Sequence, residues 1–306
     1  MPSQQIPIRD IPYDIELLTR GHRACPGCGM AIACRQALKI LGKNTVCMLS
    51  AGCFASCTAG PFPTSSIGTP AIFGSFGSTG AALSGIEAAL RIKGRNKDFN
   101  IVAIAGDGGT ADIGYQSLSA AIDRGHNIIY ICYDNEAYMN TGIQKSGSTP
   151  YGAWTTTTPV GRLIKGKQQP KKPLAQLFAT NGAYYSATAS IAYVSDWVGK
   201  VKRAIEVTQA GLGPAFLHIP AECPTGWRYP SEHTVELARL AVLTGWWALY
   251  EIEHGEFKLN FRPKNREPVE AYLRPQGRFR HFTAEDIAKI QERIDKDWEV
   301  LESDMI

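Results

Sequence analysis

The strongest structural signal in the chain is the stretch FNIVAIAGDGG, residues 99–109. Its apolar residues form an unbroken run of strand length, which is typical of a central strand in a parallel sheet covered on both faces. The run ends in Gly106, Asp107, Gly108 and Gly109. Ligands of open parallel sheets bind outside the carboxyl ends of the strands, so we expect this glycine-rich turn to belong to a functional site.

The segments that follow complete a strand, helix, strand unit. Residues 111–125, ADIGYQSLSAAIDRG, predict a helix, and residues 127–135, NIIYICYDN, predict a second buried strand. Such a unit has a right-handed crossover and places its two strands in one parallel sheet. The same alternation elsewhere predicts a doubly wound α/β domain with a mostly parallel sheet. The other predicted elements are a helix at 29–41 ended by Gly42, a strand at 44–53, a helix at 81–92, a helix at 194–211, a strand at 214–223, and a last helix at 284–302 with Thr283 and Asp286 as its capping residues.

Two regions interrupt this alternation. Residues 54–79 are rich in Gly, Ser, Thr and Pro and predict irregular backbone, which at this length usually works in a site or is disordered. Towards the end of the chain, short pieces of alternating aromatic and charged residues replace the strand and helix patterns. We therefore predict an α/β domain at 1–225 followed by a C-terminal extension at 226–306.

Composition excludes several classes of protein. With 306 residues, 44% of them hydrophobic and 20% charged, the chain is long enough to bury a large core. The formal net charge of +4 is small and the basic residues are scattered, which argues against nucleic-acid binding, although KGKQQPKK at 165–172 is a candidate docking patch. No apolar run approaches the roughly 20 residues of a membrane-spanning helix, and the first residues lack a secretory pattern, so we expect a cytoplasmic protein with no membrane partner.

The eight cysteines are not expected to form a disulfide framework, because the cytoplasm keeps thiols reduced. Two of them, Cys25 and Cys28, form a Cys-x-x-Cys pair in the glycine-rich turn GHRACPGCG, residues 21–29. Such a pair can exchange disulfides or supply half of a zinc or an iron–sulfur site, and the local residues do not distinguish these roles.

The GDGG turn has a partner at the end of the next predicted strand. Asn135 follows that strand, 28 residues after Asp107. Carboxylate, amide and backbone carbonyl oxygens suit Mg²⁺, while the glycines and a helix N-terminus suit a phosphate group. These features predict a magnesium and diphosphate cradle and match the spacing of the thiamine diphosphate signature, in which the carbonyl of Ala137 is the third magnesium ligand. An Asp-Gly turn with no ligand is the alternative for the tripeptide alone.

Four segments together resemble a known family. They are GHRACPGCG, GDGGTADIGYQSLSAAIDRGHNIIYICYDNEAYMNTGIQKSG, TPYGAWTTTTPVG and CPTGW, spread between about residues 20 and 280. This combination closely resembles the thiamine-diphosphate-binding β subunit of 2-oxoacid:ferredoxin oxidoreductases, especially that of pyruvate:ferredoxin oxidoreductases. The resemblance implies the diphosphate half of the thiamine diphosphate-binding fold. It also implies oxidative decarboxylation of a 2-oxoacid, with pyruvate as first choice, coenzyme A as acyl acceptor and ferredoxin as electron acceptor.

The resemblance also implies the site residues. One 4Fe-4S cluster would be held by Cys25, Cys28, Cys53 and Cys223, the last two of which follow predicted strands. Asn140 matches an asparagine that the family places near the reacting substrate, and we predict that it is catalytic. We expect the other four cysteines, Cys34, Cys47, Cys57 and Cys132, to be buried small residues, with Cys57 as the least certain. The implied thiamine diphosphate contacts are Cys53, Gly106, Asp107, Gly108, Gly109, Asn135, Ala137, Asn140 and Thr141, and the implied magnesium ligands are Asp107, Asn135 and Ala137.

The family pattern implies that this chain works with partners. A glutamate that activates the pyrimidine ring lies on a separate α subunit in the family, so we expect an obligatory α-subunit interface, to which residues 226–306 contribute. Ferredoxin-like γ and δ subunits or domains are further implied partners. The chain differs from part of the family at Met30, where some members have Glu, and in SAG at 50–52 and FGSTG at 76–80.

These differences lie near the expected site and leave oxalate or another 2-oxoacid as an alternative substrate. Two other functions stay open at this point. The first is the half of a non-redox thiamine diphosphate lyase, which would need no cluster. The second is an assembly subunit whose fold is stabilised by a zinc ion bound to the four cysteines, since four thiolates also suit zinc.

Overall fold

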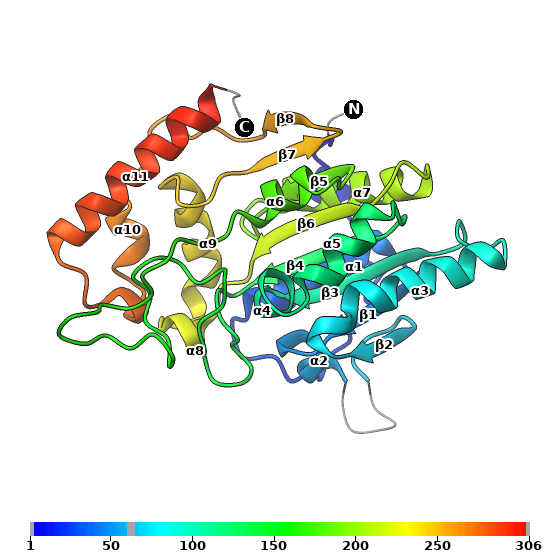
Figure 1. The fold of residues 1–306 in the computed structure, drawn as a ribbon, viewed down its shortest axis with the longest axis horizontal. Coiled ribbons are helices and arrows are strands. Elements are labelled where there is room, and N and C mark those ends of the chain that lie inside the picture. Colours follow the sequence, from blue (N-terminus) through cyan, green and yellow to red (C-terminus); the bar gives the residue numbers. More distant parts are fainter. Residues whose placement is uncertain (1–2, 60–64, 304–306) are drawn as a thin grey trace.

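The computed structural model describes residues 3–59 and 65–303, and within them eight strands form one sheet (Figure 1). The strand order is β2-β1-β3-β4-β6-β5-β7-β8, with β3, the strand of the GDGG stretch, between β1 and β4. The first six strands are parallel, and β7 and β8 are antiparallel. The strands are β1 Thr45–Ser50, β2 Ala71–Gly74, β3 Asn100–Gly106, β4 Ile129–Asp134, β5 Tyr185–Thr188, β6 Ala215–Pro220, β7 Tyr250–Glu253 and β8 Glu256–Leu259.

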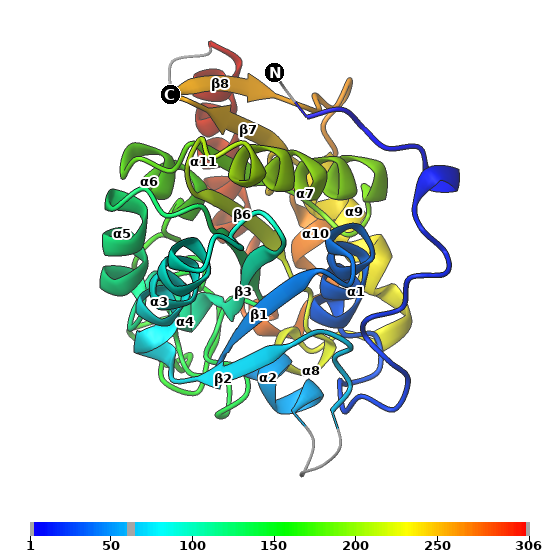
Figure 2. The same ribbon diagram turned by 90° about the vertical axis from the view of Figure 1, so that its right-hand side faces the viewer.

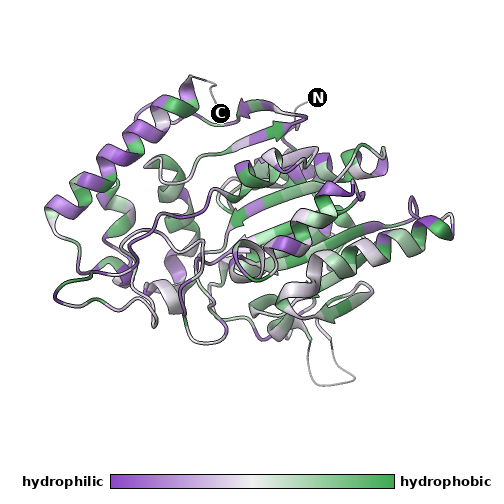
Figure 3. Ribbon diagram, viewed as in Figure 1, coloured by the Kyte–Doolittle hydropathy of each residue, from purple (hydrophilic) through white to green (hydrophobic). Residues whose placement is uncertain are grey.

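Helices cover both faces of the sheet, as the unbroken apolar run in β3 predicted (Figure 2). Val102 and Ile104 of β3 pack in the core beneath α1 and α7, while Ile101 and Ala103 pack beneath α3, α5 and α6 on the other face. The hydrophobic colouring of the central strands follows from this double burial (Figure 3). The α-helices are α1 Gly29–Leu41, α2 Cys53–Thr58, α3 Thr79–Ile92, α4 Asp107–Ala111, α5 Tyr115–Asp123, α6 Leu174–Thr180, α7 Val194–Gln209, α8 Pro224–Trp227, α9 Thr234–Leu243, α10 Glu270–Leu273 and α11 Ala284–Glu302.

The strand order reverses between β1 and β3. From β1 the chain moves outward to the edge strand β2, and it then returns to the other side of β1 to form β3. Parallel sheets of this kind bind ligands at such a switch point, because the connections leave in opposite directions and open a crevice there. Cys53 follows β1 and Asp107 follows β3, so the topology brings these two predicted site residues to the same crevice.

Two local predictions were wrong. The segment 54–79 is not wholly irregular, because it contains most of α2 and all of β2, whereas its residues 60–64 lie outside the described part of the chain. The predicted helix at 111–125 is broken into α4, which begins at Asp107, and α5. The break falls at Gly114, where an added Cβ would lie 2.1 Å from the Gly109 carbonyl oxygen. The backbone therefore turns too tightly there for one continuous helix.

Residues 226–306 contribute to the sheet as well as to a helical layer. β7 pairs with β5, and β8 pairs with β7. The predicted capping box of α11 is confirmed, since the Thr283 hydroxyl accepts the Asp286 N–H and the Asp286 carboxylate accepts the Thr283 N–H. Trp298 of α11 is buried in a separate apolar cluster of this region. The division at residue 225 stays a prediction.

None of the helices in the described residues is long and apolar enough to cross a bilayer.

Candidate active site

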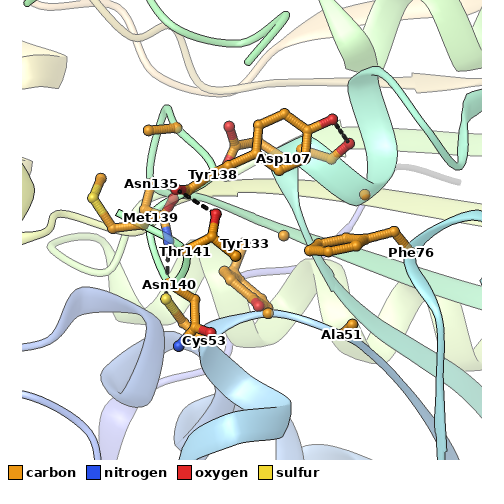
Figure 4. A pocket seen from close by; sticks show the side chains of 15 residues that line it. Ala51, Cys53, Phe76, Asp107, Tyr133, Asn135, Tyr138, Met139, Asn140 and Thr141 are labelled. Atoms are coloured by element: carbon orange, nitrogen blue, oxygen red, sulfur yellow. Dashed lines mark hydrogen bonds between the residues drawn. The ribbon is translucent and has the colours of Figure 1, made fainter. Parts of the chain in front are cut away.

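All nine residues that the sequence assigned to cofactor binding line one pocket at the carboxyl edge of the sheet (Figure 4). The pocket forms where the β1–α2 turn, the GDGG turn and the loop after β4 meet, with Phe76 as one wall. Its volume is about 20 Å³, which is room for about one water molecule. This space is too small for a cofactor, so the chain alone forms one side of a cofactor site and does not enclose it.

The glycines of the GDGG turn allow close packing of the pocket wall. An added Cβ on Gly108 would lie 2.5 Å from the ring of Tyr138, and one on Gly109 would lie 3.0 Å from the Ser50 hydroxyl. The Tyr138 hydroxyl donates to the Gly108 carbonyl at 3.0 Å, and its ring meets Phe76 edge to face at 5.8 Å. These contacts fix the loop after β4 against the first turn of α4, whose N–H groups have no partner within the helix.

Asn135, Asp107 and Ala137 converge beside this turn. The terminal amide of Asn135 lies 3.1 Å from Asp107 Oδ1 and 2.8 Å from the Ala137 carbonyl oxygen, and with no cation present its nitrogen donates to both. Turned the other way, the amide presents its oxygen, and three oxygen atoms this close repel one another unless a cation or a proton lies between them. In an octahedral magnesium site with ligands at about 2.0–2.1 Å, neighbouring oxygens are about 2.9 Å apart. The distances from the Asn135 amide to Asp107 and to Ala137 are therefore those of neighbouring ligands in such a site.

The turn after β4 is held in an unusual conformation. Glu136 has a φ of 65°, which is uncommon for a residue with a side chain. The Glu136 N–H donates to Asp134 Oδ1 at 2.9 Å, and this bond reverses the chain directly after the strand. As a result, the side chain of Asn135 and the carbonyl of Ala137 point to the same place.

Buried charges support this turn from behind. Lys171 Nζ lies 2.8 Å from Asp134 Oδ2 and 2.6 Å from Glu136 Oε1, and Arg278 pairs with the other side of Glu136. His218 Nε2 lies 2.7 Å from Asp134 Oδ2. Burial opposes the charge on Asp134, but Lys171 and His218 outweigh it, and the pKa of Asp134 lies well below its usual value. Sequence reasoning missed this network because its members are far apart in the chain.

Asp107 is oriented by a residue that sequence reasoning also missed. The Ser146 hydroxyl donates to Asp107 Oδ2, which leaves Oδ1 facing Asn135. Asp107 is almost fully buried. Burial and the nearby charge of Asp134 raise the pKa of Asp107 well above its usual value. In this position the ionised form of Asp107 is favoured only when a cation compensates its charge.

The four predicted cluster cysteines come from three segments, since Cys25 and Cys28 share one turn. Cys53 lines the pocket, and it also lies near Cys28 and Cys223. Burial raises the pKa of the Cys53 thiol, and the charges of Cys223 and Cys28 add to the effect. Burial likewise raises the pKa of Cys223 to about 11, with Cys28 and Cys25 contributing. The Cys223 sulfur accepts the Gly226 N–H at 3.3 Å.

The spread of these cysteines bears on what they can hold. Among the described residues, no three His, Cys, Asp or Glu side chains lie close enough together to hold a single metal ion. Thiolates bound to one zinc ion at about 2.3 Å would have sulfur atoms about 3.8 Å apart.

The other cysteines divide into two types. Cys34, Cys47 and Cys132 are buried, as predicted, whereas Cys57 is only partly buried. Burial raises the pKa of Cys57 to about 11, and Cys28 and Cys25 contribute to the shift. Cys57 thus lies one helical turn after Cys53 on the edge of the cysteine group.

Glu222, next to Cys223, is a further buried group that the sequence analysis did not single out. Neither of its carboxylate oxygens has a hydrogen-bond partner within the part of the chain that the structure describes. Burial raises the pKa of Glu222 to about 8. An added Cβ on Gly29 would lie 2.9 Å from Glu222 Oε2, so the carboxyl group lies against the start of α1.

Two of the four lysines in the candidate docking patch at 165–172 point inward, whereas Lys165 and Lys172 are exposed, so the patch stays a prediction. Lys167 is 1% exposed and donates to the carbonyls of Gly147, Thr149 and Pro170. Lys171 joins the buried network described above. Lys167 and Lys171 therefore fasten the loops around the site, because they are bound by oxygen atoms, and Lys165 and Lys172 remain exposed.

Comparison with known proteins assigns this site to a class. Residues 50–219, more than half of the chain, match the family described as "Thiamine pyrophosphate enzyme, C-terminal TPP binding domain". This match spans the β1–α2 turn, the GDGG turn and the loop after β4. The fold and site are those of a thiamine diphosphate-dependent enzyme.

Two curated relatives and one solved structure narrow the class. The chain is 54% identical over 280 residues to pyruvate synthase subunit PorB of Methanothermobacter marburgensis, covering 92% of this chain and 95% of the relative. It is 46% identical over 297 residues to ketoisovalerate oxidoreductase subunit VorB of Pyrococcus furiosus, covering 95% and 94%. A 2-oxoglutarate:ferredoxin oxidoreductase from Magnetococcus marinus shares the fold, with a TM-score of 0.55 and 22% identity over 76% of this chain and 79% of that one. The chain belongs to the family of 2-oxoacid:ferredoxin oxidoreductase subunits that includes PorB and VorB, and it is a subunit of a larger complex.

Proposed function

We propose that this chain holds the diphosphate end of thiamine diphosphate through Mg²⁺ and carries one 4Fe-4S cluster, in a complex that oxidises a 2-oxoacid and reduces ferredoxin. The convergence of Asp107 Oδ1, the Asn135 amide oxygen and the Ala137 carbonyl carries the proposal. Hard oxygen ligands in this spacing fit Mg²⁺, and the cation would offset the buried charge of Asp107. Replacing Asp107 with Ala is expected to abolish thiamine diphosphate binding, whereas unchanged binding would favour an assembly subunit.

The chain's own residues position and shield the cofactor. Bound thiamine diphosphate supplies the carbanion that adds to the keto carbon of a 2-oxoacid and takes up the charge left by departing CO₂. The rings of Phe76 and Tyr138, which meet edge to face at 5.8 Å, form an aromatic wall beside the proposed cofactor position. Asn140 is exposed at the mouth of the pocket, with its amide oxygen 3.4 Å from the Ser56 hydroxyl. Its amide can therefore reach a substrate carbonyl, as the proposed catalytic role requires.

The cluster proposal is supported by four free cysteines that lie near enough for their charges to act on one another. Iron and sulfide analysis of the anaerobically purified complex is expected to give four iron atoms per chain. Replacing Cys25, Cys28, Cys53 or Cys223 with Ser should lower the iron content, whereas Cys57→Ser, a matched change one helical turn from Cys53, should not. A complex without iron would favour a non-redox lyase, and one with zinc would favour a zinc-stapled subunit.

Partners are needed to complete the site. Within the described residues the pocket lining contains no glutamate, so the group that activates the pyrimidine ring is proposed to come from an α subunit. The exposed apolar side chains of Ile72, Phe73, Leu163 and Ile164 offer contact surface for such a subunit, and residues 226–306 are proposed to contribute. Ferredoxin-like γ and δ subunits or domains would take the electrons to ferredoxin in the cytoplasm. The chain without its α subunit should therefore bind cofactor weakly and show no turnover.

The substrate proposed first is pyruvate, with coenzyme A as acyl acceptor. It is favoured because the relative that is 54% identical is a pyruvate synthase subunit, while the ketoisovalerate oxidoreductase subunit is 46% identical. The anaerobic complex should be assayed with pyruvate, 2-oxoglutarate, branched 2-oxoacids and oxalate, with and without coenzyme A. A higher kcat/KM for another acid than for pyruvate would overturn this choice and leave the rest of the proposal intact.

A further inference from the structure

Asn135 lies between the magnesium site and the cysteine group, and we infer that it couples them. In this inference, binding of Mg²⁺ and thiamine diphosphate to its amide oxygen directs its N–H at Cys53 and makes the cluster easier to reduce. Asn135 is a positioning residue in this role, because it acts on the cluster through a ligand. The inference rests on the proposed function.

The geometry places the two ends of one amide on two different sites. When the amide oxygen faces Asp107 Oδ1 and the Ala137 carbonyl, Nδ2 of Asn135 donates to Cys53 Sγ at 3.8 Å, which is a long hydrogen bond even for sulfur. The side chain is 5% exposed, so water does not compete strongly at either end. Figure 4 shows the amide between Asp107 and Cys53.

This orientation is the one that a cation selects. If the amide were reversed, its nitrogen would donate to Asp107 Oδ1 at 3.1 Å and to Ala137 O at 2.8 Å. That arrangement satisfies both acceptors without a cation and turns the amide oxygen towards Cys53. A magnesium ion on the three oxygens excludes it. The direction of the Asn135 amide therefore depends on whether the cofactor site is loaded.

The direction of the amide changes how strongly negative charge on the Cys53 sulfur is stabilised. A hydrogen bond to a cluster-ligating thiolate stabilises negative charge, and one-electron reduction adds negative charge, so the bond raises the reduction potential. A cation on the amide oxygen polarises the group and strengthens its N–H as a donor. The Gly226 N–H on Cys223, at 3.3 Å, belongs to the first turn of α8 and does not depend on the cofactor. Cys53 thus receives a hydrogen bond that depends on the cofactor, and Cys223 receives one that does not.

The expected effect is about tenfold. Hydrogen bonds to charged groups are stronger than those between neutral groups, but this bond is long at 3.8 Å, so we expect an effect of one order of magnitude and no more. A tenfold change in the equilibrium constant of a one-electron couple corresponds to about 59 mV. The potential should therefore rise by about this amount when Mg²⁺ and thiamine diphosphate bind, and an oxidised cluster would become the better acceptor only beside a loaded cofactor.

The test is a redox titration of the complete complex, followed by the EPR signal of this reduced cluster, with and without Mg²⁺ and thiamine diphosphate. In the wild-type complex the potential should be higher with the cofactor. Asn135→Asp keeps an oxygen for the magnesium and removes the N–H. In this variant, the rise in potential on cofactor binding should therefore be smaller by about 59 mV, which is a tenfold change in the equilibrium constant. Proton ENDOR after exchange into D₂O should show one strongly coupled exchangeable proton fewer in the variant.

Asn140→Asp is the matched control, because it adds the same charge to the same pocket without removing a donor from Cys53. A shift as large in this control as in Asn135→Asp would overturn the inference in favour of a simple charge effect. If the reduction potential of the wild-type complex is the same with and without the cofactor, the inference is overturned, even if the variants fail to fold. A complex without iron would overturn the proposed function itself, which distinguishes the two failures.

Discussion

Replacing Lys171 with methionine should destabilise the chain by about 3 kcal/mol, because it removes a cation from a buried group of charges. Lys171 Nζ lies 2.8 Å from Asp134 and 2.6 Å from Glu136, and its side chain is 19% exposed. Removing one partner of a buried ion pair costs about 3–5 kcal/mol, since the remaining charge is left uncompensated. His218 still contacts Asp134 and Arg278 still contacts Glu136, which places the loss at the lower end of this range.

The neighbouring lysine provides the matched control. Lys172 lies 3.0 Å from Asp112, but its side chain is 44% exposed, and exposed pairs contribute about 0–1 kcal/mol. Urea unfolding of the full chain, followed by tryptophan fluorescence, should therefore show a much larger loss for Lys171→Met than for Lys172→Met. Equal losses within about 0.5 kcal/mol would refute the reasoning that burial decides the contribution of these charges.

The pH dependence gives a second check on the same change. Because the pKa of Asp134 is lowered in the folded chain, the stability it contributes is present above the unfolded value of about 3.9 and is lost as the pH falls. Without Lys171 this contribution is smaller. The decline in the free energy of unfolding below about pH 4 should therefore be shallower in Lys171→Met than in the wild type.

Three further predictions follow from the site. Ser146→Ala removes the donor that orients Asp107 and should weaken cofactor binding about 10–100-fold in calorimetry of the complex; unchanged affinity would contradict this. Gly108→Ala, with a Cβ 2.5 Å from a tyrosine ring, should cost about 1–3 kcal/mol, whereas Gly85→Ala, with open space around it in a helix, should be neutral or stabilising. Burial lowers the pKa of Lys167 to about 8, so unfolding free energy should rise by up to about 1.4 kcal/mol per pH unit between about 8 and 10.4, and Lys167→Met should remove that slope.

The strands of the central sheet were predictable because they are continuous apolar runs. The turn at Gly106–Gly109 and the position of Asn135 were also predictable, because a parallel sheet brings successive strand ends together. β5 was missed because it has only four residues, two of them the polar Ser186 and Thr188, so it shows no apolar run of strand length. The break at Gly114 depends on the approach of Gly109 in space, which no local pattern records.

The buried charges that hold the turn after β4 could not be predicted for a related reason. Glu136 and Arg278 are separated by more than a hundred residues, and their pairing depends on how the C-terminal region folds back onto the sheet. The sequence showed the lysines of 165–172 as a basic cluster, but their direction is set by carbonyls and carboxylates in other loops. Composition predicts which charges exist, whereas burial decides what they bind.

The pairing of β7 with β5 has a consequence for how the chain is made. β5 comes at residues 185–188, but the strand that covers its edge, β7, comes only at 250–253. During synthesis the β5 edge therefore stays unpaired until the last fifth of the chain leaves the ribosome, and unpaired edges invite aggregation. A shortened chain that stops at residue 225 would keep this edge open permanently, so expression of the protein in pieces should retain β7 and β8.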